Sequence, residues 1–403
     1  MRSRHAVATG LAERTSEVFG AVAEASFPVD TTLGMSTETN GPGGAAAERT
    51  GGRPLPVSGA SRPRVLFICG SINQTTQLHE IARELPEIEA WFTPYSCDGF
   101  LERLRRLGLL GFTILGGPWR RDCVDYLNRQ ALPIDMDGAG GPYDLVVTCS
   151  DLVVPRNVRR QPLLLVQEGM TDPEGLGFRL RKIFPSLPLW VAGTAGTGLS
   201  GLYDTFCVAS PGYRDLFVRK GADPRRIAVT GIPNFDDCRG YLINDFPHRG
   251  YVLVCTSDAR ETWKLDNRRR FIRRAVAIAA GRPLIFKLHP NENVARSTRE
   301  IERHAPGAMV FTQGSAEEMV ANCEVLIVQD STLAYVGLAL DKEVHAYADL
   351  EQLRRLLPLQ GGGAARHIAG ACRALLGQPT GGVAEIPGTL RSSPSSRGRQ
   401  VAA

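Results

Sequence analysis

The residues best suited to chemistry follow an apolar run in the C-terminal half of the chain. Residues 284–288 predict a buried strand of a parallel sheet, and His289-Pro290 follows at the end where such a strand delivers side chains to a ligand. Pro290 restricts the backbone of His289 to extended conformations, so the imidazole has a defined direction. This imidazole can stabilise a phosphate, or it can merely end the strand, and the local sequence leaves both interpretations open.

Four other predicted strands also end in small or charged polar residues. These ends are Gly70-Ser71, Glu168-Gly169, Thr256-Ser257 and Asp330-Ser331-Thr332. Ligands of open α/β sheets bind at the carboxyl ends of the strands, so we expect the five ends to collect along one crevice between two domains.

Glu168 is the candidate general base. A carboxylate that ends a strand and faces a crevice is placed to accept a proton from a substrate hydroxyl. Asp172, four residues further along the loop, is the competing base. The alternative role of Glu168 is a structural hydrogen bond to the loop backbone.

The phosphate-binding prediction centres on the segment that begins at Asp330. Its hydroxyls and N–H groups precede the apolar run 333–340, which predicts a helix whose N-terminus favours an anion. Plain N-capping by Asp330 or Ser331 can coexist with that role. The full set of predicted nucleotide- and phosphate-binding residues is Gly70, Ser71, Thr256, Ser257, Lys287, Pro290, Glu292, Ser331 and Thr332. Lys287 has the alternative of extending to the protein surface.

Two successive series of alternating strands and helices must position these groups. Predicted strands lie at 65–69, 90–95, 143–149, 162–167, 205–208 and 226–233, and then at 251–255, 284–288, 308–311 and 324–328. The pattern predicts an α/β protein with two facing Rossmann-like domains and mostly parallel sheets, a GT-B-like arrangement. We expect a disordered extension over 1–62, an N-terminal domain over 63–240, a C-terminal domain over 241–377 and a disordered tail over 378–403.

Composition excludes several classes of function. The net charge of +5 in 403 residues is mild and the arginines are dispersed, which argues against a nucleic-acid binder. The nine cysteines form no CxxC pair, so no zinc site is expected and reduced buried thiols are favoured. Neither a secretory signal nor a membrane span is predicted. The basic run 267–274 reads as the solvated face of a helix, or alternatively as a patch for a membrane surface or an acidic partner.

The motif series resembles a known group of enzymes. Gln167-Glu168-Gly169, Leu288-His289-Pro290 and Asp330-Ser331-Thr332 are similar, in this order, to the acidic-Gly, His-Pro and Ser-Ser/Ser-Thr motifs of bacterial GT-B transferases with cytidine nucleotide donors. These include sialyltransferases and polysialyltransferases and, more loosely, capsular Kdo transferases and CDP-glycerol glycerophosphotransferases. The resemblance covers about residues 64–350. Residues 221–233 also resemble non-hydrolysing UDP-GlcNAc 2-epimerases, whose opening loop usually reads Gly-Thr-Arg-Pro-Glu where this chain has residues 70–74.

The resemblance implies a glycosyltransferase, or a polyol-phosphate transferase, that acts on a hydroxyl of a cell-envelope glycan or lipid. The donor is a nucleotide-sugar or CDP-polyol held by the C-terminal domain, and the acceptor lies on the N-terminal domain. Glu168 or Asp172 is then the base, while His289 and the Ser331-Thr332 helix start stabilise the departing phosphate. No metal or other cofactor is expected. We expect a cytoplasmic protein, with peripheral contact at the inner membrane left open.

Two other functions remain open. The first is a sugar-nucleotide epimerase of the non-hydrolysing type, and the second is a catalytically silent protein that binds a nucleotide-sugar. Transfer or slow hydrolysis of the donor, interconversion of epimers and binding alone distinguish the three.

Overall fold

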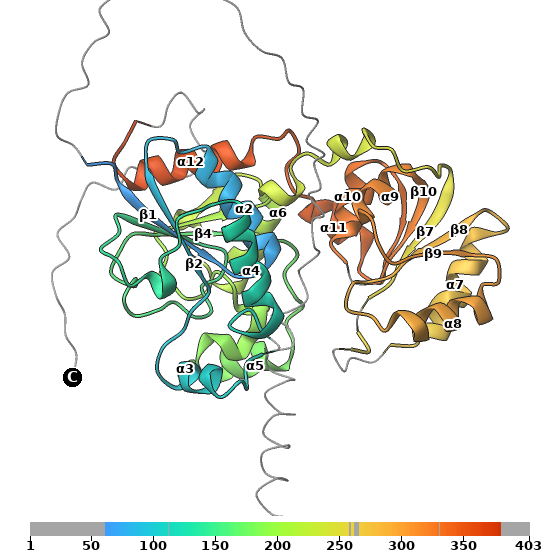
Figure 1. The fold of residues 1–403 in the computed structure, drawn as a ribbon, viewed down its shortest axis with the longest axis horizontal. Coiled ribbons are helices and arrows are strands. Elements are labelled where there is room, and N and C mark those ends of the chain that lie inside the picture. Colours follow the sequence, from blue (N-terminus) through green and yellow to red (C-terminus); the bar gives the residue numbers. More distant parts are fainter. Residues whose placement is uncertain (1–60, 112, 258, 262–265, 330, 380–403) are drawn as a thin grey trace, which may run out of the picture.

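Two parallel sheets form two lobes in the computed structural model of the chain (Figure 1). The structure describes residues 61–379 apart from 112, 258, 262–265 and 330. The N-terminal sheet has six strands in the order β2-β1-β3-β4-β5-β6, and the C-terminal sheet has five in the order β11-β10-β7-β8-β9. All strand pairs within both sheets are parallel. The predicted α/β class with two Rossmann-like domains is therefore confirmed.

The strands of the N-terminal lobe are short and apolar because helices and loops cover both faces of the sheet. They are β1 (Arg64–Cys69), β2 (Glu89–Pro94), β3 (Leu145–Thr148), β4 (Leu163–Val166), β5 (Thr205–Val208) and β6 (Ile227–Val229). The helices are α2 (Ile72–Arg83), α3 (Gly99–Arg106), α4 (Gly117–Arg129), α5 (Leu176–Ile183) and α6 (Pro211–Lys220), with 3-10 turns η2 (Met136–Gly138), η3 (Leu189–Gly196) and η4 (Pro224–Arg226). Every residue of β3 and β4 is buried.

The C-terminal lobe repeats this construction. Its strands are β7 (Tyr251–Cys255), β8 (Leu284–Lys287), β9 (Met309–Phe311), β10 (Cys323–Ile327) and β11 (Glu343–His345). Its helices are α7 (Arg268–Ala279), α8 (Val294–His304), α9 (Ala316–Asn322), α10 (Leu333–Ala339) and α11 (Leu350–Leu356), and the turns η5 (Pro233–Phe235) and η6 (Cys238–Leu242) connect the lobes. Side chains of Asn267, Asn293 and Ser315 cap α7, α8 and α9, which explains where these helices begin.

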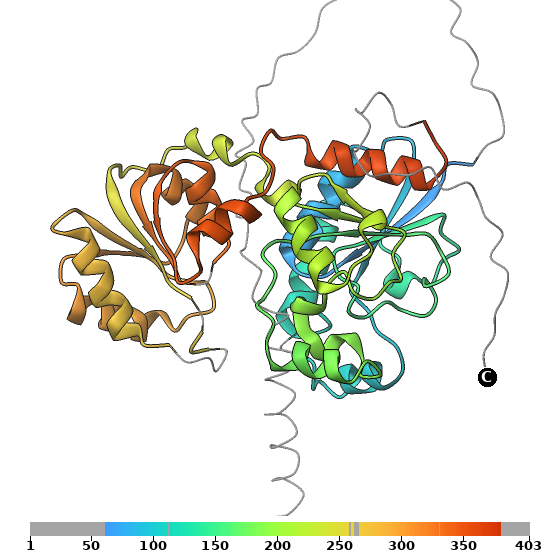
Figure 2. The same ribbon diagram turned by 180° about the vertical axis from the view of Figure 1, so that it is seen from behind.

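The last helix does not belong to the lobe that precedes it in the sequence. Helix α12 (Ala364–Leu375) returns across the molecule and packs on α2 of the N-terminal lobe (Figures 1 and 2). Ile368 and Cys372 are fully buried there, and Arg373 forms an ion pair with Glu87 at 2.6 Å. The expected C-terminal domain of 241–377 is therefore wrong at its end, because an amphipathic segment does not reveal in its own sequence which surface it covers.

The two lobes meet along α6, α10 and α11. The hydroxyl oxygens of Tyr213 on α6 and Tyr335 on α10 lie 2.7 Å apart, and both rings are buried. Ser210 donates to the carbonyl of Leu356 at 3.0 Å. Gly212 lies so close to α11 that an added Cβ would meet the carbonyl oxygen of Arg355 at 1.9 Å. These contacts hold α6 of the N-terminal lobe against α10 and α11 of the C-terminal lobe.

Candidate functional site

The carboxylate of Glu168 is held by two side chains from the start of α2. Ser71 Oγ donates to Oε1 at 2.8 Å, and Gln74 Nε2 donates to Oε2 at 2.6 Å. Strand β4 delivers Glu168 to this place, and the loop after β1 supplies both donors. Strands β1 and β3 mark the point where the strand order reverses, which is the usual ligand-binding position of such a sheet.

The surroundings of Glu168 favour a base of raised proton affinity. Burial raises the pKa of Glu168 above the usual 4.5, the hydrogen bonds from Gln74 and Ser71 lower it, and the charge of Asp172 adds to the rise. The carboxylate of Asp172 accepts a hydrogen bond from Thr194 of η3. Asp172 therefore lies near Glu168 but is held by a different element.

Two residues that were predicted to contact phosphate have structural roles within the protein. Ser71 is fully buried, caps α2 by accepting from the N–H of Gln74 at 3.2 Å and uses its proton on Glu168. At Gly70, an added Cβ would lie 2.1 Å from Gln74 Oε1, so this glycine makes room for the Gln74 side chain. Gly70 and Ser71 thus position Gln74 and Glu168, and their binding of phosphate stays a prediction. Sequence reasoning missed Gln74, whose only signal is its place one helical turn after Ser71.

The loop that follows Glu168 lies against the C-terminal lobe. A Cβ added at Gly169 would lie 3.7 Å from Thr332 Cγ2 and 3.6 Å from the ring of Phe235. Asn234 Nδ2 donates to the carbonyl of Glu168 at 3.4 Å. The structure thus brings the predicted ends Glu168-Gly169 and Ser331-Thr332 together at the junction of the lobes.

A buried carboxylate fixes the loop that carries His289. Glu292 accepts from the backbone N–H of His289 at 3.0 Å, from Ser297 Oγ at 3.2 Å and from the hydroxyl of Thr256. Arg268 forms an ion pair with it at 2.8 Å. The side chain of Glu292 is 0% exposed. The polar atoms of Glu292 and Thr256 hold the His289 loop, and their predicted contact with the nucleotide stays a prediction.

We call the buried pair Arg268 and Glu292 the clamp. Arg268 joins this clamp to the segment that follows β7. Its guanidinium also pairs with Asp266 at 2.9 Å and donates to the carbonyl of Ser257 at 2.7 Å, although the side chain is only 4% exposed. The rest of the basic run is on the solvated face of α7, while Phe271 and Ile272 are buried, as the sequence predicts. Sequence reasoning missed Arg268 because nothing separates it from the exposed arginines beside it.

The ring of His289 has a preferred tautomer. Its Nδ1 accepts from the N–H of Asn291 at 3.2 Å, so the neutral ring carries its proton on Nε2, where it can donate to an anion. His289 is half-buried and Pro290 is exposed. His289 therefore follows the end of β8, as the sequence predicts.

The strand ends β7 and β10 meet where the order of the C-terminal sheet reverses. Ser257 Oγ donates to Oε1 of Gln329 at 2.8 Å across this point, so its hydroxyl proton is used within the lobe. Beyond the end of β10, Ser331 Oγ accepts from the N–H of Leu333 at 3.3 Å. Thr332 is the N-cap residue of α10, and its side chain makes no capping hydrogen bond. Asp330, the other predicted capping residue, lies outside the described residues.

Lys287 lies at the end of β8 with 8% of its surface exposed. Its Nζ donates to the carbonyl of Thr312 at 3.2 Å. Burial lowers the pKa of Lys287, against the opposing effects of Cys255 and Glu317. Its ammonium group is thus directed toward the loop after β9, not away from the molecule.

Other chemical features are few within the described part of the chain. All nine cysteines are buried and free of disulfides, as predicted. Over residues 61–379 with their gaps, no group of three His, Cys, Asp or Glu could hold a metal ion. No helix in the same residues has the length and hydrophobicity needed to cross a bilayer. A cavity of about 510 Å³ lies beside the clamp and is lined by Arg260, Asp266, Asn267, Arg268, Arg269 and Glu300.

Comparison with known proteins gives similarity in three dimensions alone. No family model and no curated sequence matches the chain. It is similar to S. aureus MnaA in complex with UDP, with 11% identity and a TM-score of 0.49 over 81% of this chain and 100% of that one. It is also similar to UDP-GlcNAc 2-epimerase from Neisseria meningitidis bound to UDP-GlcNAc, with 11% identity and a TM-score of 0.47 over 77% of this chain and 99% of that one. Its similarity to the wall teichoic acid polymerase TagF has 9% identity and a TM-score of 0.43 over 78% of this chain and 89% of that one.

Proposed function

We propose that the chain is a GT-B-type transferase that moves a sugar, or a polyol phosphate, from a nucleotide-activated donor to a hydroxyl of a cell-envelope glycan or lipid. The observation that carries the proposal is the carboxylate of Glu168. It is oriented by Ser71 and Gln74, its pKa is raised by burial, and its loop adjoins Thr332 of the opposite lobe.

The proposed reaction is a single displacement. Glu168 takes the proton of the acceptor hydroxyl as its oxygen bonds to the transferred group, and the bond from that group to the nucleotide phosphate breaks. The electron pair and negative charge stay on the departing phosphate. The Nε2–H of His289 and the hydroxyl of Ser331 are the donors that we propose stabilise this charge, with no metal required.

The test uses candidate donors activated by CMP, CDP, UDP and GDP, in D₂O. We expect transfer or slow hydrolysis of one donor, unchanged by EDTA, and no deuterium at C2 of UDP-GlcNAc. Glu168→Gln should abolish turnover with little change in nucleotide affinity, and Asp172→Asn is the matched control for the competing base. His289→Ala should reduce turnover by about 10²-fold or more.

Three results would contradict this reaction. Deuterium at C2, lost in Glu168→Gln, would establish the epimerase instead. Nucleotide binding without turnover for every donor would leave a binding protein. Turnover lost in EDTA and restored by magnesium would contradict the metal-free step.

A further inference from the structure

The large apolar side chains that are exposed to solvent are not spread evenly over the protein. Of the fifteen in the described residues, seven lie in two short segments, 100–109 and 176–184. They are Phe100, Leu107, Leu109, Leu176, Leu180, Ile183 and Phe184. Five of them are more than half exposed: Phe100 at 67%, Leu107 at 72%, Leu176 at 75%, Ile183 at 67% and Phe184 at 55%. Such a concentration marks an interaction surface, whereas scattered single residues would not.

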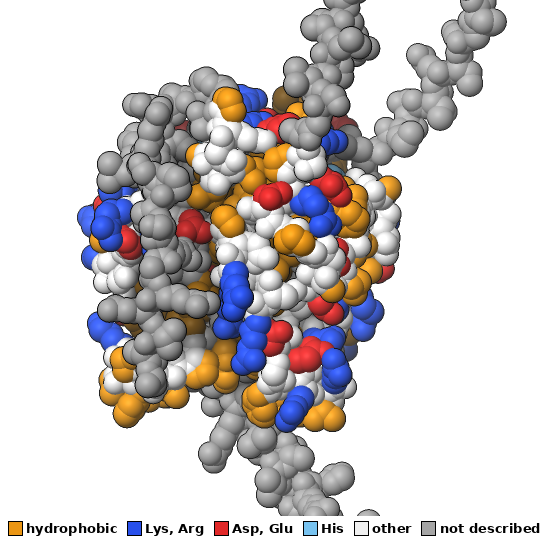
Figure 3. Space-filling view, turned by 90° about the vertical axis from the view of Figure 1, so that its left-hand side faces the viewer, with side chains coloured by type: hydrophobic (Ala, Val, Ile, Leu, Met, Phe, Trp, Pro, Cys, Tyr) orange, Lys and Arg blue, Asp and Glu red, His pale blue; other side chains and the backbone are white. Residues whose placement is uncertain are grey.

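Both segments lie at one end of the N-terminal lobe. Helices α3 and α5 occupy the same lower end in Figures 1 and 2. The lower edge of the space-filling view in Figure 3 shows hydrophobic side chains with Lys and Arg side chains among and above them. Phe178 is the residue of α5 that is buried, and it packs in a small cluster with Ala192 and Ala195 of η3. The rest of the apolar side of α5 therefore faces solvent.

The charged residues of these segments are mostly basic. Helix α5 carries Arg179, Arg181 and Lys182 and no acidic residue. In α3 the one acidic side chain, Glu102, is neutralised by ion pairs with Arg105 at 2.6 Å and Arg106 at 2.7 Å.

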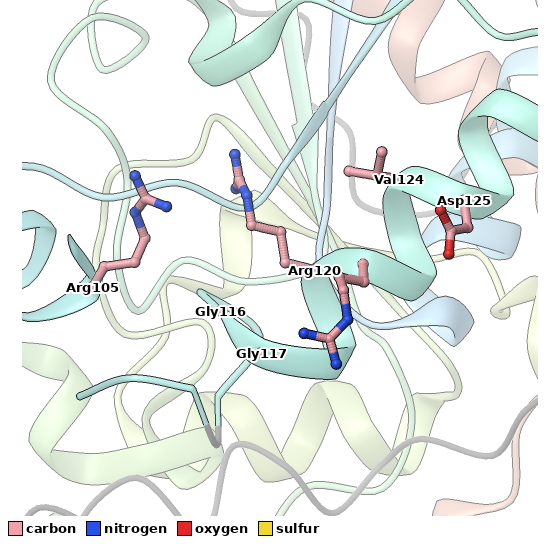
Figure 4. A pocket seen from close by; sticks show the side chains of 7 residues that line it. Arg105, Gly116, Gly117, Arg120, Val124 and Asp125 are labelled. Atoms are coloured by element: carbon pink, nitrogen blue, oxygen red, sulfur yellow. The ribbon is translucent and has the colours of Figure 1, made fainter. Parts of the chain in front are cut away.

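A cavity lies beside α3. It has a volume of about 350 Å³ and is lined by Arg105, Gly116, Gly117, Arg120, Arg121, Val124 and Asp125. Figure 4 shows the Arg105 side chain on one side of this cavity and helix α4 on the other. Arg105 pairs with Glu102 and Arg120 with Asp137 at 3.5 Å, so the cavity itself adds little net charge, and the positive charge near the apolar side chains comes from α3 and α5.

The basic run on α7 is different. Its arginines 269, 270, 273 and 274 are exposed, but its large apolar residues Phe271 and Ile272 are buried in the core. The exposed surface of α7 is thus basic with Val276, 40% exposed, as its one exposed large apolar side chain, whereas α3 and α5 combine charge with exposed Leu, Ile and Phe. That combination is typical of helices that lie in a lipid headgroup layer.

We propose that segments 100–109 and 176–184 form a docking surface for an anionic lipid bilayer. The apolar side chains enter the headgroup boundary, and the arginines and Lys182 pair with lipid phosphates. A second copy of this surface fits poorly, because it would bring the same positive charges together. The loop from Glu168 leads directly into α5, so the docked lobe would present its candidate base next to the lipid surface.

The test is co-sedimentation of the full chain with vesicles. We expect binding to phosphatidylcholine vesicles containing about 30% phosphatidylglycerol, much weaker binding to phosphatidylcholine alone, and a loss of binding at about 0.5 M salt. The variant Leu176→Ser/Ile183→Ser and the variant Arg179→Gln/Lys182→Gln should each reduce binding by at least about tenfold. Leu176, Arg179, Lys182 and Ile183 are all exposed, so these substitutions leave the packed core unchanged.

Matched controls separate this surface from general stickiness and charge. Ile243→Ser removes a side chain that is 91% exposed in the connection between the lobes, and Arg270→Gln/Arg273→Gln removes two charges from α7. Binding should change less than about twofold in both. Equal losses in control and test variants, no binding to anionic vesicles, or a dimer in solution that the α5 variants dissociate would overturn the proposal. None of these outcomes depends on the transferase reaction.

Discussion

At the scale of single residues, the site is built from side chains that hold other side chains. Ser71 and Gln74 converge on Glu168, and Arg268 holds Glu292, which in turn holds the backbone of His289. The groups that would touch substrate are thus fewer than the polar residues at the strand ends suggest. Such support is what keeps reacting groups in a defined geometry.

The bond from Gln74 to Glu168 predicts a change in pH dependence. Gln74 lowers the pKa of Glu168, so Gln74→Leu should raise this pKa further. A general base works when ionised, and the acid limb of kcat/KM should therefore move to higher pH, while the rate at high pH changes less. Thr76→Val on the same helix is the control. An acid limb that stays in place would show that Glu168 is not the titrating base.

The clamp at Arg268 predicts a large effect on stability. Arg268→Met leaves the buried carboxylate of Glu292 without its cation and leaves Asp266 with the more distant Arg260 at 3.7 Å, which should lower the free energy of unfolding by about 3–5 kcal/mol. The neighbouring exposed Arg269→Met should change it by less than about 0.5 kcal/mol. Urea denaturation of both variants measures the difference, and equal stability of the two would contradict a structural clamp.

At the scale of elements, the apolar runs located most strands of the two sheets. The strands at 205–208 and 251–255 have the predicted bounds. Apolar runs of four to six residues are read reliably because a buried parallel strand must be apolar on both faces. This is why the positions of Glu168 and His289 after their strands follow from the sequence.

The partners of these groups could not be predicted in the same way. Gln74 meets Glu168 across 94 residues of sequence, and Arg268 meets Glu292 across 24, so each contact depends on tertiary placement. The helix α5 was not predicted either. Its exposed leucines and isoleucine match no core-facing period, and it is held mainly through one buried phenylalanine.

A close backbone approach predicts how α5 is attached. An added Cβ at Gly177 would lie 2.1 Å from the carbonyl oxygen of Val191 in η3. Gly177→Ala should therefore destabilise this contact by about 1–3 kcal/mol, although alanine ordinarily favours a helix. Gly175→Ala, where the nearest such atom is 4.0 Å away, is the control. Protease cleavage within 170–190 should increase in the first variant alone, and unchanged cleavage would mean that the backbones separate at no cost.

At the scale of the whole molecule, helix α12 makes the N-terminal lobe depend on the end of the described chain. A chain that stops after residue 362 loses the buried side chains of Ile368 and Cys372 and the pairing of Arg373 with Glu87. We expect the N-terminal lobe to lose at least about 3 kcal/mol of stability.

A chain that stops after residue 378 keeps the whole of α12 and is the control. The thermal unfolding midpoint of each truncated protein, followed by near-UV circular dichroism, measures the difference. Equal midpoints would show that α12 only rests on the surface of the lobe.

The return of α12 also sets an order of events during synthesis. Ribosomes add roughly 5–20 residues per second, so the segment between β7 and α12 takes on the order of 10 s to make. Throughout that interval the surface of α2 that α12 covers is exposed on the nascent chain, while the whole C-terminal lobe emerges between the two parts of the first core. The N-terminal lobe, whose synthesis begins first, is therefore completed only after the C-terminal lobe has been made.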